Sequence, residues 1–219
     1  MTLLIVHYLN KSRAQRLLWL LEELELPYEI KFYERGLDYR APAALKAIHP
    51  LGKSPVIEDD GVIVAESGAI FEYLIEKYGH GRLAPQPGTP ERLRYTYWLH
   101  YAEGSAMPLL VMKLIFNRIP AQVPFFLKPF ARTICGAVAA KLIDPQLVEN
   151  ATLWETELGR DGWFAGREFT AADIIMSFPV EQLGNRAKSV AGSPAIKSYL
   201  EAIKNRPAYQ KALQRVPAE

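Results

Sequence analysis

The sequence predicts an α/β domain at residues 1–80, a linker at 81–89 and an all-α helical-bundle domain at 90–219. Three observations support this division. The first domain alternates between short apolar runs of strand length and stretches with helical spacing. The next stretch is rich in Gly and Pro and lacks a helical period, which is typical of a linker. After residue 90 helical patterns continue, and no convincing strand pattern occurs.

The first domain is expected to mix strands and helices. Leu17 and Leu21 share one face of the first expected helix, as buried apolar residues do. Asp60-Gly61 between two apolar runs is a strong β-hairpin signal, and Ser67 is expected to cap the helix that follows. The order is strand, helix, strand, short helix, hairpin, helix, at residues 3–8, 13–25, 28–33, 42–47, 55–65 and 67–79. This is the order of a thioredoxin-like domain, in which the first two strands are parallel.

In the second domain we expect helices only. Thr89-Pro90 is typical of an N-cap followed by a first-turn proline, and Thr170 with Asp173 forms a variant capping box. The segment 119–130 holds three prolines among apolar residues, so it is expected to interrupt the helices. It is either a connection packed onto the helices or a hydrophobic wall of a ligand site. The helices are expected at 90–118, 131–142, 144–159, 171–184, 194–204 and 207–214.

The composition disfavours several classes of function. The net charge is only +2 and no dense run of Lys and Arg occurs, so we expect no nucleic-acid partner. Cys135 is the single cysteine, which allows no intrachain disulfide and favours a reducing, cytoplasmic location. No signal-peptide pattern and no membrane-spanning run is found, so we expect no membrane partner. The four histidines lack metal-ligand spacing, and we expect no metal.

The turn after the first strand is the first candidate site. A helix N-terminus carries unpaired N–H groups and a partial positive charge, which stabilise a thiolate or carboxylate. Ser12 can cap this helix or donate its hydroxyl to a bound anion. Tyr8 can donate a phenol hydroxyl or pack in the core, and Asn10 can orient a ligand or form a turn.

Two further stretches can bind charged groups. Ser54-Pro55 opens a strand, and a cis peptide bond there would present backbone groups to a ligand. Lys53 beside it can bind a carboxylate or lie in solvent. Ser67 stands at a second helix start, which suits an anion, and Glu66 just before it can bind an ammonium group.

One absence restricts the chemistry. A thioredoxin-like domain normally uses a cysteine at the start of its first helix. Here Ser12 occupies that position, and Cys135 lies in the helical half. A thiol handled by this domain would therefore belong to the ligand.

The sequence resembles the soluble glutathione transferases over essentially its whole length. The resemblance rests on "SRAQRLLWLLEEL", "HPLGKSPVIEDDGVIVAESGAIFEYL", the linker and "WFAGREFTAADI". It is similar to a bacterial and fungal branch that carries the Ser-Arg-Ala helix start. The resemblance implies a thioredoxin-like domain that binds glutathione, a helical domain that holds a hydrophobic electrophile, and a homodimer that serves in detoxification.

The resemblance also implies roles for single residues. Glu66 and Ser67 match the pair that holds the α-amino and α-carboxylate groups of the γ-glutamyl part. Ser54 matches the residue, before a cis proline, whose backbone pairs with the cysteinyl part. Lys53 and Arg40 match positions that contact the glycyl carboxylate.

Two residues are candidates for the hydroxyl that activates the glutathione sulfur. Ser12 matches the serine-type members and is favoured because of the flanking Ser-Arg-Ala, whereas Tyr8 lies near the place of the tyrosine in other members. Asn10 is a further alternative. Helical spacing makes Tyr97, Tyr101, Met107, Met112 and Phe116 candidates for the apolar co-substrate site, although core packing is the stronger interpretation for most of them.

We therefore expect an enzyme that conjugates the glutathione thiolate to small hydrophobic electrophiles. Two alternatives stay open: a glutathione-dependent peroxidase or reductase on the same scaffold, and a glutathione-binding module without catalysis. The sequence does not name the electrophile, because members of one fold differ in substrate.

Overall fold

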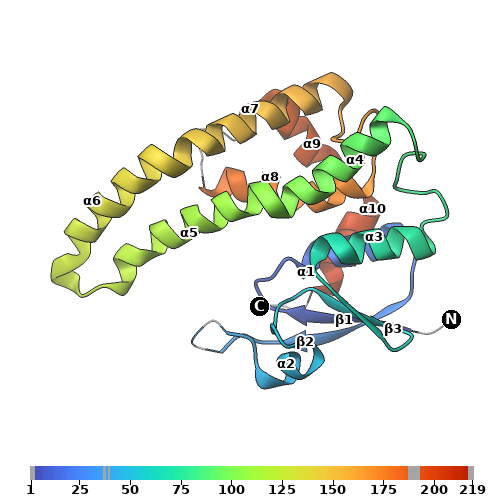
Figure 1. Cartoon of the computed structure of the whole chain (residues 1–219), viewed down its shortest axis with the longest axis horizontal. Helices are drawn as coiled ribbons and strands as arrows, with labels where there is room; N and C mark the ends of the chain where they lie inside the picture. Colours follow the sequence, from blue (N-terminus) through green and yellow to red (C-terminus); the bar gives the residue numbers. More distant parts are fainter. Residues whose placement is uncertain (1–2, 37, 39, 187–192, 217–219) are drawn as a thin grey trace.

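A four-stranded mixed sheet and a set of helices make up the computed structural model, which describes residues 3–36, 38, 40–186 and 193–216 (Figure 1). The strands lie in the order β2-β1-β3-β4. β1 pairs with β2 in parallel and with β3 antiparallel, as predicted for a thioredoxin-like sheet. The strands are β1 (Leu4–Leu9), β2 (Tyr28–Tyr33), β3 (Val56–Asp59) and β4 (Val62–Ala65).

The first part of the chain contains three helices between and after these strands. They are α1 (Ala14–Glu23), α2 (Ala43–Ile48) and α3 (Ser67–Tyr78). The β3–β4 hairpin turns at Asp60 and Gly61, which have φ angles of 55° and 80°. Positive φ at both turn residues is the geometry that favours Asp-Gly, so this prediction is confirmed.

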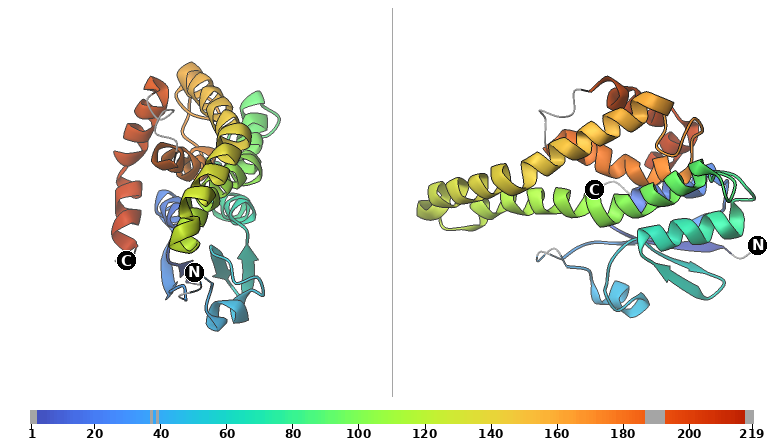
Figure 2. Two further views of the ribbon diagram at one scale, coloured as in Figure 1. Left: turned by 90° about the vertical axis from the view of Figure 1, so that its left-hand side faces the viewer. Right: turned by 45° about the horizontal axis from the view of Figure 1, so that its top comes forward.

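Every element from α4 onward in the described residues is helical. The π-helical segment η1 joins α4 to α5, and the π-helical segment η3 joins α6 to α7. The short 3₁₀ turn η2 lies between α5 and α6. The elements are α4 (Pro90–Tyr101), η1 (Ala102–Ala106), α5 (Met107–Gln122), η2 (Phe125–Leu127), α6 (Lys128–Val138), η3 (Ala139–Ile143), α7 (Asp144–Asp161), α8 (Ala171–Arg186), α9 (Pro194–Lys204) and α10 (Pro207–Arg215). α5 and α6 form a long hairpin that extends beyond the sheet (Figure 2, right).

Two of the capping predictions hold. Thr89 caps α4 by accepting the backbone N–H of Arg92 at 3.2 Å. Asp173 accepts the N–H groups of Thr170 and Phe164, both at 2.8 Å, so the carboxylate also fastens the loop before α8.

Two other capping predictions were wrong by one residue. Arg13 occupies the N-cap position of α1 without a side-chain capping hydrogen bond, and Ser12 precedes it. Glu66, with a φ of 72°, precedes α3, and Ser67 is already the first helical residue. Both serines still lie at a helix start, so their side chains reach the first-turn N–H groups or the space in front of them.

The proline-rich segment 119–130 behaves differently from either interpretation of it. α5 continues through Pro120 to Gln122, and the chain breaks only at Val123 and Pro124. Phe125 and Phe126 are 81% and 66% exposed, so these two side chains are not packed onto the helices, although Pro120 is buried. No residue of the segment lines the cavity described below. The segment forms the exposed end of the α5–α6 hairpin.

The two parts of the chain meet across α1. Trp19 is fully buried between Tyr209 of α10, whose ring centroid is 5.0 Å away, and Phe169. Its indole N–H donates to Glu23 at 2.8 Å, and Glu23 in turn pairs with Arg206 at 2.6 Å. α10 therefore covers the face of α1 that carries Trp19.

Among the described residues, no helix is long and apolar enough to cross a membrane. The same part of the chain contains no group of three or more His, Cys, Asp or Glu side chains placed to hold a metal ion.

Candidate active site

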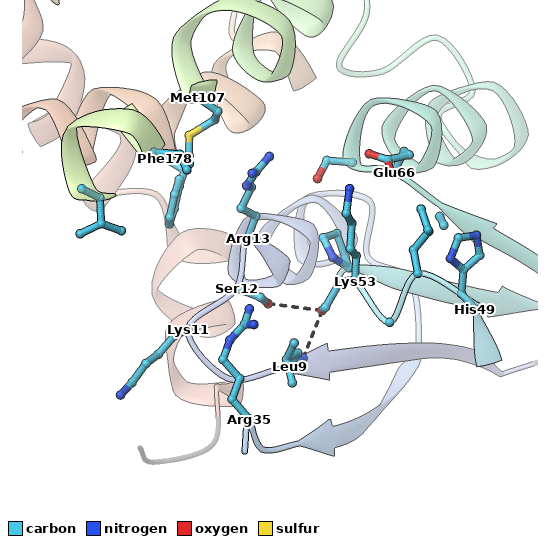
Figure 3. Close-up of a pocket in the computed structure, with 18 residues that line it drawn as sticks. Leu9, Lys11, Ser12, Arg13, Arg35, His49, Lys53, Glu66, Met107 and Phe178 are labelled. Atoms are coloured by element: carbon cyan, nitrogen blue, oxygen red, sulfur yellow. Dashed lines mark hydrogen bonds between the residues drawn. The ribbon is translucent and has the colours of Figure 1, made fainter. Parts of the chain in front are cut away.

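A cavity of about 350 Å³ lies between the sheet end of the thioredoxin-like part and the helical part (Figure 3). Its polar side comes from the turn after β1, the loop before β3 and the start of α3. Its apolar side comes from α5 and α8. Ser12, Lys53 and Glu66, which are far apart in the sequence, all line it.

A chain of hydrogen bonds joins the turn after β1 to the loop before β3. The Ser12 hydroxyl donates to the Ser54 hydroxyl oxygen at 3.3 Å, and the Ser54 hydroxyl donates to the carbonyl of His7 at 2.9 Å. The N–H of Leu9 donates to the same Ser54 oxygen at 3.1 Å. Ser54 thereby fixes the end of β1, and it places the Ser12 hydroxyl at the cavity wall.

Ser12 also lies at the positive end of α1. Its oxygen accepts the N–H of Ala14 at 3.3 Å, within the first turn. Its proton points to Ser54, but that neutral hydrogen bond is long, and an anionic acceptor in the cavity would compete for it. The hydroxyl and the helix start are thus placed to stabilise the same negative charge.

The second helix start lies on the other side of the cavity. Glu66 is exposed and lines the cavity, whereas Ser67 is only 5% exposed. Pro55, which follows Ser54, also lines the cavity, and the Ser54–Pro55 peptide bond is cis. A carboxylate beside the N-terminus of α3 suits a zwitterionic group, because the helix start attracts its carboxylate and Glu66 attracts its ammonium group.

Most of the charges around the cavity are positive. Lys11, Arg13, Arg35 and Lys53 line it together with the single carboxylate of Glu66. Burial lowers the pKa of Arg35 from its ordinary value. This surplus favours a ligand with a net negative charge.

A buried ion-pair network supports the cavity from behind. Arg16 is fully buried, and it donates to the carbonyl of Ile175 in α8 at 2.5 Å and to the Ser67 hydroxyl at 3.5 Å. Arg16 and Arg13 both pair with Glu103, which belongs to the π-helical segment η1. Burial lowers the pKa of Arg16, and the charge of Glu103 opposes that shift. The network holds α1, α3, α8 and η1 in one arrangement.

The apolar wall differs from the one that helical spacing suggested. Met107 lines the cavity as expected, but its neighbours are Val111, Leu114 and Phe178. Tyr101, by contrast, is buried and donates to Asn150 at 2.7 Å. The other expected wall residues, Tyr97, Met112 and Phe116, also do not line this cavity. No spacing signal singles out Phe178, because its position depends on how α8 crosses α5.

Three other predicted residues lie outside the cavity. Tyr8 is 3% exposed, and its ring stacks on Phe32 at 5.9 Å. The side-chain oxygen of Asn10 accepts the backbone N–H of Arg35 at 2.9 Å, so Asn10 shapes the turn. The Arg40 side chain is 80% exposed, beside Asp38, whereas Arg35 lines the cavity.

His49 is a lining residue that the sequence interpretation missed. The absence of metal-ligand spacing among the histidines gave no reason to assign it to a site. The signal that could have found it is its position in "HPLGKSP", the loop that also supplies Lys53 and Ser54.

The fold and cavity together define a thioredoxin-like protein with a helical half and no cysteine at the first helix start. The family models agree with this class. Residues 1–76 match the model for the glutathione S-transferase N-terminal domain, and residues 139–207 match the model for the C-terminal domain.

Several relatives match the chain over nearly its whole length. Glutathione S-transferase 3 of Schizosaccharomyces pombe is 35% identical, over 98% of this chain and 88% of the relative. A crystal structure of a glutathione S-transferase from Actinobacillus pleuropneumoniae is 31% identical with a TM-score of 0.74, covering 97% of this chain and 92% of that one. A glutathione transferase homologue from Lodderomyces elongisporus, with two GSH per subunit, has a TM-score of 0.80 at 18% identity, covering 99% and 100%. At that identity it supports the fold alone.

The chain belongs to the glutathione S-transferase family. It is a glutathione transferase, an enzyme that joins the glutathione sulfur to an electrophile.

Proposed function

We propose that the cavity between the two parts of the chain is the active site and that Ser12 is the hydroxyl donor to the glutathione sulfur. One observation carries this proposal: Ser12, Ser54, Glu66 and Ser67 line the same cavity although 55 positions separate the first from the last. Tyr8 is buried and lies outside the cavity lining.

The bound tripeptide would lie along the polar wall. Glu66 and the start of α3 with Ser67 hold the γ-glutamyl ammonium and carboxylate groups. The backbone of Ser54 pairs with the cysteinyl part, and Lys53 binds the glycyl carboxylate. Arg35 takes the role that Arg40 was expected to share, because Arg35 lines the cavity.

The thiolate would be favoured at the start of α1. Free thiols have a pKa near 8.5, which falls beside a helix N-terminus and positive charge. Ser12 donates to the sulfur, and Arg13 adds positive potential from the cavity wall. The thiolate then attacks an electrophile held against Met107 and Phe178.

The remaining parts of the proposal concern setting and assembly. The electrophile is a small hydrophobic molecule, and the enzyme serves detoxification in the cytoplasm without a metal. It acts as a homodimer, for which β4 and α4 offer exposed apolar side chains: Val62, Ile63, Leu93 and Tyr97.

The test compares Ser12→Ala with Tyr8→Phe in the conjugation of a chloronitrobenzene. We expect Ser12→Ala to lower kcat/KM by about 100-fold, the effect of losing one hydrogen-bond donor to a developing or bound anion. It should also raise the pKa of bound glutathione, measured from thiolate absorbance against pH. Tyr8→Phe should leave both quantities near wild type.

Unchanged kinetics and thiol pKa in Ser12→Ala would overturn the assignment of the donor. Glutathione binding without turnover of any electrophile or hydroperoxide would instead indicate a binding module. Turnover of hydroperoxides in preference to the chloronitrobenzene would indicate a peroxidase on the same scaffold.

A further inference from the structure

The free end of the α5–α6 hairpin exposes an unusual set of aromatic side chains. Phe125, Phe126 and Phe130 are 81%, 66% and 68% exposed, and the rings of Phe125 and Phe126 are 5.6 Å apart. Apolar side chains more than a third exposed flank them: Ile119, Leu127 and Ile134. We call residues 119–134 the hairpin tip. Large exposed apolar patches on a folded protein mark interaction sites.

The tip is separate from the active-site cavity. The cavity is lined by the beginning of α5, at Met107, Val111 and Leu114, whereas the tip lies at its far end. Figure 1 shows the α5–α6 hairpin extending past the sheet and past α8, and the right-hand view of Figure 2 shows the same. The tip and the cavity-lining residues therefore lie at opposite ends of α5.

The charge of this hairpin has one sign. No Asp or Glu occurs between Glu103 and Asp144, whereas the same stretch contains five basic residues: Lys113, Arg118, Lys128, Arg132 and Lys141. Lys113 is paired with Asp144 at 2.5 Å. Lys128 and Arg132 lie on α6 beside the exposed aromatic side chains, so the tip itself combines apolar and positive groups.

The aromatic groups and the positive groups take different sides of the helix. Phe126, Phe130 and Ile134 follow at four-residue spacing and share one side of the chain at α6. Lys128 and Arg132 have the same spacing but are offset by two residues, which rotates them to the other side. The apolar groups therefore point outward from the hairpin, and the cations lie toward α5, where Arg132 lines a shallow crevice but stays exposed. Apolar groups with cations beside them are typical of segments that bind the surface of a bilayer.

We propose that the hairpin tip docks on the surface of an anionic phospholipid membrane. Phe125, Phe126 and Phe130 insert into the headgroup region, where aromatic rings are favoured. Lys128 and Arg132 contact the negative headgroups. A second copy of this chain is a poorer occupant, because tip-to-tip association would bring like charges together. The tip thereby revises our expectation that the protein has no membrane partner.

The test is co-sedimentation of the full chain with vesicles of phosphatidylcholine, with and without phosphatidylserine. We expect binding only with phosphatidylserine present, and we expect salt to weaken it. The variant Phe125→Ser/Phe126→Ser/Phe130→Ser should bind about 100-fold less or worse, because three exposed rings no longer insert. Its matched control is Leu213→Ser, an exposed apolar residue on α10, which should bind as wild type.

The contribution of Lys128 and Arg132 to vesicle binding is tested in the same assay. Lys128→Gln/Arg132→Gln should weaken binding about 25-fold, since each cation near an anionic surface contributes about fivefold. The matched control is Lys197→Gln/Lys204→Gln on α9. All variants should retain wild-type melting temperature and chloronitrobenzene turnover.

Three results would overturn the proposal. The first is that wild type does not bind anionic vesicles, and the second is that it binds both vesicle types equally. The third is that the phenylalanine variant binds anionic vesicles as well as wild type does. Analytical ultracentrifugation tests whether a second copy of the chain occupies the tip instead. If wild type does not bind vesicles and the phenylalanine variant forms a smaller oligomer than wild type, copies of the chain meet at the tip.

Discussion

Glu103→Gln tests whether the buried arginine network supports the fold. Glu103 is the shared partner of Arg16 and Arg13. The Arg16 side chain is 0% exposed and that of Glu103 is 22% exposed. Glutamine keeps the size and one acceptor oxygen but removes the charge, so a cation would be left in the interior without a counter-ion.

The size of the effect follows from this burial. Breaking a buried ion pair by neutralising one partner costs about 3–5 kcal/mol. Here Glu103 is partly solvated and the glutamine oxygen can still accept, so we expect a loss of about 2–3 kcal/mol in the free energy of unfolding. For a chain of this size, each 1 kcal/mol lowers Tm by about 2–4 °C, so Tm should fall by about 4–12 °C.

Thermal and urea unfolding, followed by circular dichroism, measure this loss. Asp38→Asn is the matched control, because its pair with Arg40 is 3.7 Å long and the two side chains are 60% and 80% exposed. An exposed pair of this kind contributes less than about 1 kcal/mol. If Glu103→Gln costs no more than Asp38→Asn, the Glu103 charge does not stabilise the buried arginine and the reasoning is refuted.

Three further predictions concern buried polar and aromatic groups. Burial raises the pKa of Asp59, but hydrogen bonds from Lys77 and two tyrosines outweigh it, so the pKa lies below its ordinary 3.8. The ionised Asp59 carboxylate therefore stabilises the fold above about pH 3.8, and this stabilisation is lost as the pH falls and the carboxylate is protonated. The difference in Tm between wild type and Asp59→Asn should therefore become smaller in acid, and a difference that does not change with pH would contradict this. Asp173→Ala leaves two buried N–H groups unpaired and should cost at least about 2 kcal/mol in urea unfolding, whereas a loss below about 1 kcal/mol would contradict this. Trp19→Ala should cost about 3–5 kcal/mol in the same assay, and a near-neutral result would mean that α10 does not pack on α1 as described.

Local signals in the sequence predicted the elements of the sheet well. The strand at 28–33 has the predicted bounds, and the hairpin turns at the predicted Asp60-Gly61. Both depend on neighbouring residues only, namely period-two alternation and the φ angles that Asp-Gly allows. The prolines alone did not predict where the helix breaks within 119–130. α5 continues through Pro120 and ends two residues later, at Gln122.

The burial of α1 could not be predicted from its own pattern. Its leucines mark one apolar face, and Arg16 and Trp19 lie outside that face. Both are fully buried, because the sheet packs on one side of α1 while α8 and α10 pack on the others. A helix enclosed in this way carries a buried arginine only where a carboxylate reaches it, and Glu103 comes from 87 residues away.

The site shows the same division between local and distant information. The family resemblance correctly predicted that four residues line the cavity: Lys53, Ser54, Glu66 and Ser67. Each lies beside the end of a strand or the start of a helix, and the fold determines the positions of those elements. The co-substrate wall could not be transferred in this way. Phe178 lines it through the crossing of two helices, and no single-sequence spacing encodes a crossing.

Strand alternation, however, offers an argument about the hydroxyl donor that the sequence already contained. Alternate residues of β1 share a face of the sheet, so Tyr8 lies on the face of Leu4 and Val6, and all three belong to the buried core. Its parallel neighbour in β2 is Phe32, on which it stacks, so that face is filled by packed rings. This packing supports our proposal that the hydroxyl donor comes from beyond the strand, where the chain turns to enter α1. Ser12 lies in that turn and lines the cavity, which is the physical reason to prefer it over Tyr8 as the donor.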